Sequence, residues 1–139
     1  MSKTYIPQIL RRQIRAAASE CCEYCLVPEA VAFASFHIDH IISEKQGGAT
    51  SYPNLALACR PCNISKGASI VAYSGEWDQF TRLYHPRQDA WADHFELLEN
   101  GLIKPISRIA FGTLQIMGIN DDARVIERGS LLDRGIIVL

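Results

Sequence analysis

Four of the five cysteines form two Cys-x-x-Cys pairs, Cys22–Cys25 and Cys59–Cys62. Each pair makes a tight turn with two thiolates on one side, and two facing turns complete a tetrahedral sulfur site suited to Zn²⁺. One pair alone would also fit a redox motif, whereas two pairs predict a structural zinc site. Such a site brings residues 22–25 against residues 59–62, and it constrains the fold of the whole segment between them.

The fifth cysteine, Cys21, could replace Cys22 as a ligand, but its spacing from Cys25 fits the turn less well. We therefore expect Cys21 to be a half-buried thiol outside the zinc site. No apolar run approaches the roughly 18 residues that span a bilayer, and the N-terminus has no hydrophobic signal region. We expect a soluble, cytoplasmic protein without a disulfide framework and without a membrane partner.

The composition is that of a globular protein, because 48% of the 139 residues are hydrophobic and 21% are charged. It excludes a disordered tail and a low-complexity linker. The net charge of −1 identifies no polyanionic partner. Residues 1–70 carry seven basic and five acidic residues, so a local basic patch there remains open, as does a plainly solvated helix face formed by Arg11, Arg12 and Arg15.

The pattern of apolar and turn residues predicts a mixed α+β fold. In the N-terminal half we expect a helix over 7–19, strands over 32–42 and 54–59, and a short helix from Arg60 to Lys66 that ends at Gly67. In the C-terminal half, Asn100-Gly101 predicts a hairpin between 91–99 and 102–107. Helices are expected over 113–117 and 120–133, with Asn120 as the cap of the second.

Thirty-three residues separate Cys25 from Cys59, which is more than a simple zinc ribbon needs. The segment resembles the HNH endonuclease family, in the variant whose ββα-metal core lies between two zinc knuckles. The resemblance covers Cys22 to Gly67. It rests on Phe36-His37-Ile38-Asp39-His40-Ile41-Ile42, on Gly47-Gly48, on Asn54-Leu55 and on Cys59-x-x-Cys62-Asn63-x-x-Lys66-Gly67.

The resemblance implies a role for each polar position. His40 matches the general base that activates water, which suits an imidazole near neutral pH. Asp39 and Asn63 match the ligands of a catalytic divalent cation, Mg²⁺ or Mn²⁺, which prefers oxygen donors. Asn54 matches the central asparagine, which fastens the loop and helps to orient the base. The zinc ion is structural, because four cysteine ligands leave no position for water.

Some positions depart from the family pattern or stay open. Asn63 stands where the family motif has a second histidine, and Ser43 stands where many members have proline. His37 shares a strand face with Asp39 and could touch the metal or a phosphate, or it could be a partly exposed strand residue. Lys66 could contact a phosphate or simply end its helix.

The sequence thus predicts a zinc-stapled HNH core over 1–70 and an α+β extension over 71–139 that packs on it. We expect a metal-dependent endonuclease that hydrolyses double-stranded DNA as a monomer or a homodimer. One alternative is a non-catalytic, zinc-containing module that binds nucleic acid. Another is an interaction protein in which zinc is purely structural. The segment 83–95 also looks like a recurring extension in a subset of HNH proteins, and no activity is assigned to it.

Overall fold

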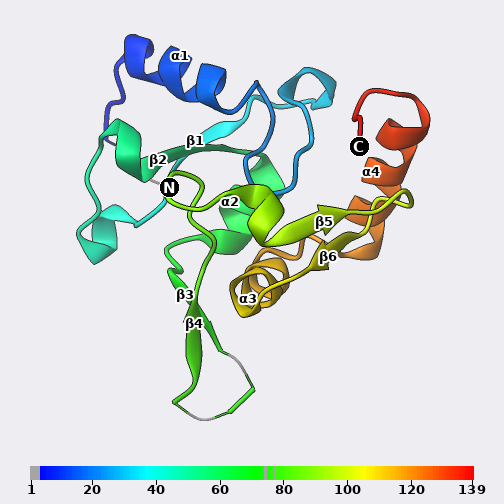
Figure 1. The fold of residues 1–139 in the computed structure, drawn as a ribbon. Coiled ribbons are helices and arrows are strands. Elements are labelled where there is room, and N and C mark those ends of the chain that lie inside the picture. The colour runs from blue at the N-terminus through cyan, green and yellow to red at the C-terminus, as the bar shows by residue number, and fades with distance from the viewer. Residues whose placement is uncertain (1–3, 74, 77) are drawn as a thin grey trace.

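The computed structural model describes residues 4–73, 75–76 and 78–139, and this part of the chain forms a small α+β fold (Figure 1). The helices are α1 (Gln8–Ala17), α2 (Arg60–Lys66), α3 (Arg108–Met117) and α4 (Asp122–Asp133). The strands are β1 (His37–His40), β2 (Leu55–Ala58), β3 (Val71–Tyr73), β4 (Phe80–Arg82), β5 (Phe95–Leu97) and β6 (Ile103–Pro105). They pair as three antiparallel two-stranded sheets, β1–β2, β3–β4 and β5–β6. Among the described helices, none has the length and apolarity needed to cross a bilayer.

The β1–β2 hairpin and helix α2 follow one another in the chain and form the centre of the N-terminal half. In the hairpin, His37 lies opposite Ala58 and His40 lies opposite Leu55. All four residues of β2 are buried, and a fully buried leucine contributes about 1.5–3 kcal/mol. Helix α2 then starts directly at the second cysteine pair, with Pro61 in its first turn, and ends at Gly67 as predicted.

The C-terminal half contributes the β5–β6 hairpin and helices α3 and α4. Gly101 in the hairpin loop has a φ of 95°, which explains the Asn-Gly signal in the sequence. Helix α3 is longer than predicted, because the hydroxyl of Ser107 accepts a hydrogen bond from the Ala110 amide and starts the helix there. Buried side chains of both halves join one apolar core, which includes Leu55 and Leu57 as well as Ile103 and Met117.

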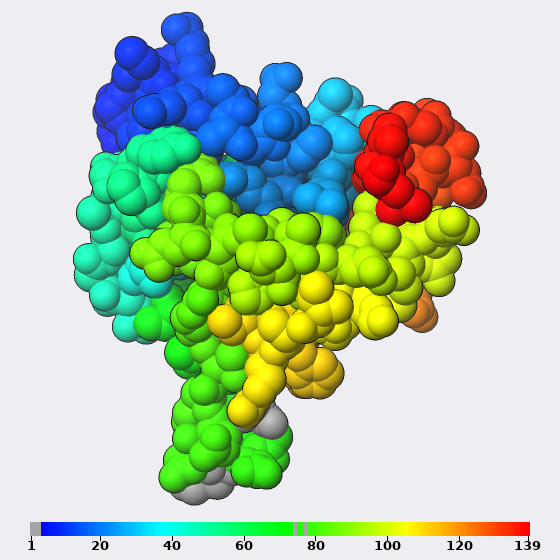
Figure 2. All heavy atoms as spheres, viewed as in Figure 1, coloured from blue at the N-terminus to red at the C-terminus, as the bar shows by residue number. Residues whose placement is uncertain are grey.

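Two local predictions are wrong, and one hairpin was missed. The strand predicted over 32–42 is reduced to His37–His40, and Phe33 is fully exposed instead of packed. Asn120 does not cap α4, because its side chain bonds both backbone groups of Ile103, and Asp121 takes the cap position. The β3–β4 hairpin was not predicted. It protrudes from the body of the molecule (Figures 1 and 2). The exposed side chains of Tyr73 and Phe80 pack edge to face on this hairpin.

Candidate functional site

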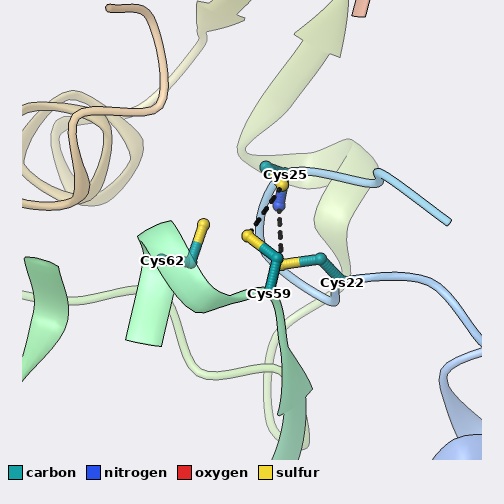
Figure 3. Close-up of side chains that lie close together, drawn as sticks. All are labelled: Cys22, Cys25, Cys59 and Cys62. Carbon is teal, nitrogen blue, oxygen red and sulfur yellow. Dashed lines mark hydrogen bonds between the residues drawn. The ribbon is translucent and has the colours of Figure 1, made fainter. Parts of the chain in front are cut away.

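The two cysteine pairs meet in one buried cluster, as the sequence predicts (Figure 3). All four Sγ atoms lie within 4.8 Å of one another, and those of Cys25 and Cys59 are 3.6 Å apart. A tetrahedral zinc ion with Zn–S bonds of 2.3 Å separates its sulfurs by about 3.8 Å, so the geometry and the donor set fit Zn²⁺. Cys21 is half-buried and lies outside the cluster, where its thiol approaches the Ser19 carbonyl.

The pKa values of the clustered thiols are shifted in opposite directions. Burial raises the pKa of Cys22 well above its ordinary value, whereas hydrogen bonds with the neighbouring thiols, first of all with Cys22, lower the pKa of Cys25. A cation bound to all four sulfurs would stabilise them together as thiolates. Arg124 of helix α4 adds positive charge, because its Nη2 lies 2.8 Å from the Sγ of Cys62 and 3.7 Å from that of Cys59. The C-terminal half therefore contacts the cysteine cluster directly.

A second polar centre is a cavity of about 700 Å³ beside strand β1 and helix α2. Strand β1 contributes His37, Asp39 and His40 to its wall, and α2 contributes Asn63. The structure thus brings the predicted base and both predicted metal ligands to one cavity. Helix α1 adds Arg11, a half-buried residue.

Asp39 is buried, with 5% of its surface exposed, and it has two polar partners. The Tyr24 hydroxyl donates a hydrogen bond to Oδ2 at 2.8 Å. The Lys66 ammonium lies 3.1 Å from Oδ2 and 3.3 Å from Oδ1. Burial raises the pKa of Asp39, and the positive charge of Lys66 and the Tyr24 hydrogen bond oppose that rise. A carboxylate offers about four lone pairs, so Oδ1, with its single longer contact, retains one for a cation.

His40 is held by its Nε2 atom, which lies 2.8 Å from the Thr50 hydroxyl and 3.5 Å from a carboxylate oxygen of Glu44. Among the described residues, none forms a hydrogen bond with the Nδ1 atom of His40. Because a hydrogen bond to one ring nitrogen fixes the orientation of the imidazole, Thr50 orients the His40 ring through Nε2.

Asn54 fastens the loop between β1 and β2. Its amide oxygen accepts a hydrogen bond from the Ile42 amide, and its Nδ2 donates to the carbonyls of Ile42 and Ala49. Gly48 leaves room for this arrangement, because a Cβ there would lie 2.7 Å from Nδ2 of Asn54. Asn54 does not line the cavity, and its side-chain hydrogen bonds go to Ile42 and Ala49 and not to His40.

Lys66 lies behind the cavity and not on its surface. It is 2% exposed, and besides Asp39 its ammonium donates a hydrogen bond to the His40 carbonyl at 3.1 Å. These internal partners replace the phosphate contact that the sequence left open. His37 is half-buried and lines the cavity, in keeping with its place on the same strand. The oxygen donors of Asp39 and Asn63 on the cavity wall are of the type that suits Mg²⁺ or Mn²⁺.

Sequence reasoning missed the residues that hold the site in place. Thr50 and Tyr24 are bonded to His40 and Asp39, yet no spacing rule marks either of them. The one available signal for Tyr24 is its position between the two cysteines of the first pair. Arg124 carries no signal at all, because its contact with Cys62 spans 62 residues of sequence.

A comparison with protein-family models matches residues 22–69 to the HNH endonuclease family. The matched segment includes both cysteine pairs, Asp39, His40, Asn54 and Asn63. Comparisons with curated proteins and with solved structures give no match.

Proposed function

We propose that the protein is a metal-dependent endonuclease that hydrolyses phosphodiester bonds in DNA, because residues 22–69 match the HNH endonuclease family. The observation that carries the proposal is the shared cavity. Its wall holds a histidine with a free ring nitrogen, two oxygen donors for a divalent cation and an arginine, contributed by β1, α2 and α1. These are the groups that hydrolysis of a phosphodiester requires.

His40 acts as the general base in this proposal. Its Nδ1 accepts a proton from the attacking water, while Thr50 keeps the ring oriented through Nε2. The backbone carbonyl of His40 is bonded to Lys66, which fixes the end of strand β1 from behind. The imidazole is therefore held from two sides, through its ring and through its main chain.

Asp39 and Asn63 hold the catalytic divalent cation. When bound, such a cation supplies Lewis-acid stabilisation to the scissile phosphate and to the leaving oxygen. Asp39 contributes a carboxylate whose charge is partly balanced by Lys66, and Asn63 contributes a neutral amide oxygen. The Tyr24 hydrogen bond keeps the Asp39 carboxylate in a fixed orientation.

Arg11 binds a substrate phosphate. Its Nε donates to the Ile6 carbonyl at 3.1 Å, which anchors the guanidinium at the cavity wall. The structure separates Arg11 from the other arginines of α1, because Arg15 is paired with Glu29 and Arg12 is exposed away from the cavity lining. A guanidinium with unused N–H groups is well suited to phosphate oxygens.

A non-catalytic module that binds nucleic acid is the alternative, and the Lys66–Asp39 ion pair favours it. A cation already paired with the carboxylate competes with a divalent metal for the same oxygens. In that reading the cavity would still bind a phosphate through Arg11 but would perform no hydrolysis.

Incubation of the zinc-loaded protein with supercoiled plasmid, with and without Mg²⁺ or Mn²⁺, distinguishes the two functions. The endonuclease proposal predicts nicked or linear plasmid only when the divalent cation is added. Plasmid that stays intact in the presence of either cation, while a gel-shift assay shows salt-sensitive binding, would contradict hydrolysis and support the binding module. Gel electrophoresis of the same samples reports both nicking and double-strand cleavage.

A further inference from the structure

Tyr24 connects the cysteine cluster to the cavity. It lies between Cys22 and Cys25, both of which belong to the cluster, and its hydroxyl donates to Oδ2 of Asp39 at 2.8 Å. The tyrosine is 1% exposed, so no water competes for this hydrogen bond.

The C-terminal half holds the turn that carries Tyr24. The indole Nε1 of Trp91 donates to the Tyr24 carbonyl at 3.0 Å. Arg87 forms a bidentate ion pair with Glu23, the residue before Tyr24, and Glu23 in turn accepts a hydrogen bond from the Leu57 amide of β2. The segment 83–95, to which the sequence assigned no role, thus locks the first cysteine pair onto strand β2.

We propose that Tyr24 is a positioning residue for the cation-binding carboxylate of Asp39. Through Tyr24, the turn formed by residues 22–25 and the segment 83–95 set the geometry of the cavity. The inference rests on the proposed function, because it takes Asp39 as a ligand of the divalent cation. It assigns the zinc site a task beyond holding the fold together. A change in the orientation of Tyr24 is transmitted to a cation ligand through one hydrogen bond.

Tyr24→Phe tests this proposal, because it removes only the hydroxyl and keeps the buried ring. Tyr84→Phe is the matched control: Tyr84 is also buried, packs edge to face on Tyr24 with ring centroids 6.3 Å apart, and forms no hydrogen bond with Asp39. The measurement is the dissociation constant for Mn²⁺, obtained by electron paramagnetic resonance on protein with one zinc per chain. The Mg²⁺ concentration that gives half-maximal cleavage is measured beside it.

Removal of a partner that orients a ligand weakens metal binding by about 10–100-fold, and we expect a loss of this size in Tyr24→Phe. Tyr84→Phe should bind Mn²⁺ as the wild type does. Cleavage by Tyr24→Phe should recover at high Mg²⁺, which a general loss of structure would not allow. Equal Mn²⁺ affinity in wild type and Tyr24→Phe would overturn the inference, as would an equal loss in both tyrosine variants.

Trp91→Phe provides a second variant if Tyr24→Phe fails to fold. It removes the hydrogen bond to the Tyr24 carbonyl and keeps an aromatic ring against Phe95. A weaker Mn²⁺ affinity supports the inference, and an unchanged affinity overturns it.

Wild-type protein that binds Mn²⁺ but cleaves no DNA would contradict the proposed function alone, since the affinities would still decide the role of Tyr24. Wild-type protein without Mn²⁺ binding would overturn both.

Discussion

The Nζ atom of Lys66 lies 3.1 Å from Oδ2 of Asp39, and both side chains are buried. Removing one partner of such a pair leaves an uncompensated buried charge, which costs about 3–5 kcal/mol. We therefore expect Lys66→Met to lower the free energy of unfolding by about that amount, measured by urea denaturation.

Lys45→Met is the control for Lys66→Met, because Lys45 is an exposed residue on the rim of the same cavity. A surface substitution of this kind changes stability by about 0.5 kcal/mol or less. Equal free energies of unfolding in the Lys66→Met variant and the wild type would show that the ion pair does not stabilise the fold.

Arg11→Ala should weaken DNA binding, because it removes the guanidinium anchored at the cavity wall. The loss of one phosphate contact lowers the slope of log K against log [salt] by about one. Arg12→Ala is the matched control, since Arg12 is exposed on the same helix and does not line the cavity. The slope is measured by fluorescence anisotropy at several salt concentrations. An equal decrease of the slope in Arg11→Ala and Arg12→Ala would contradict the role of Arg11.

Removal of zinc should unfold the N-terminal half, because the four thiolates come from distant segments and structural zinc sites couple metal binding to folding. The double substitution of Cys59 and Cys62 by serine should abolish zinc binding and the cooperative thermal transition followed by circular dichroism. Cys21→Ser should keep one zinc ion per chain, because Cys21 lies outside the cluster. A cooperative melt in the double variant would contradict the coupling.

Asp89 makes the free energy of unfolding depend on pH in the acidic range. Hydrogen bonds from Arg82 lower its pKa from 3.8 to about 2. A carboxylate whose pKa is lower in the folded state than in the unfolded state stabilises the protein at pH values above its unfolded pKa. This contribution is lost as the pH falls from about 4 to about 2. Asp89→Asn should therefore lose stability at pH 7 and show a flatter decline between these pH values. Because Arg82 is half exposed, the expected loss is roughly 1 kcal/mol or less.

The effect of Asp89→Asn is measured by thermal melts between pH 2 and pH 7. Asp93→Asn is its control, because Asp93 is exposed and forms no ion pair with a described residue. The same pH profile in Asp89→Asn and the wild type would contradict the assignment to Asp89.

The spacing of the two cysteine pairs predicted the cysteine cluster. The resemblance singled out His40, Asp39 and Asn63, and these three line one cavity. Helix α2 was predicted at its observed bounds, since Pro61 and Gly67 mark its ends. Residues whose role depends on packing between distant segments could not be predicted. In the sequence, Lys66 is indistinguishable from a surface lysine at the end of a helix. In the structure it is buried against Asp39, 27 residues away. The sequence around Asn120 is typical of a helix cap, but the β5–β6 hairpin places Ile103 beside it and the side chain binds there.

The most direct test of the account compares His40→Ala with His37→Ala in single-turnover cleavage of a DNA duplex. Both histidines lie on β1 and line the same cavity, so the two variants are matched in location, and they are compared at equal zinc content. General-base catalysis contributes about 10²–10⁴-fold, and the account predicts a loss of this size for His40→Ala. His37→Ala should keep its rate constant within a few-fold of the wild type. Cleavage by His40→Ala at the wild-type rate would contradict the assignment of this cavity as the nuclease active site.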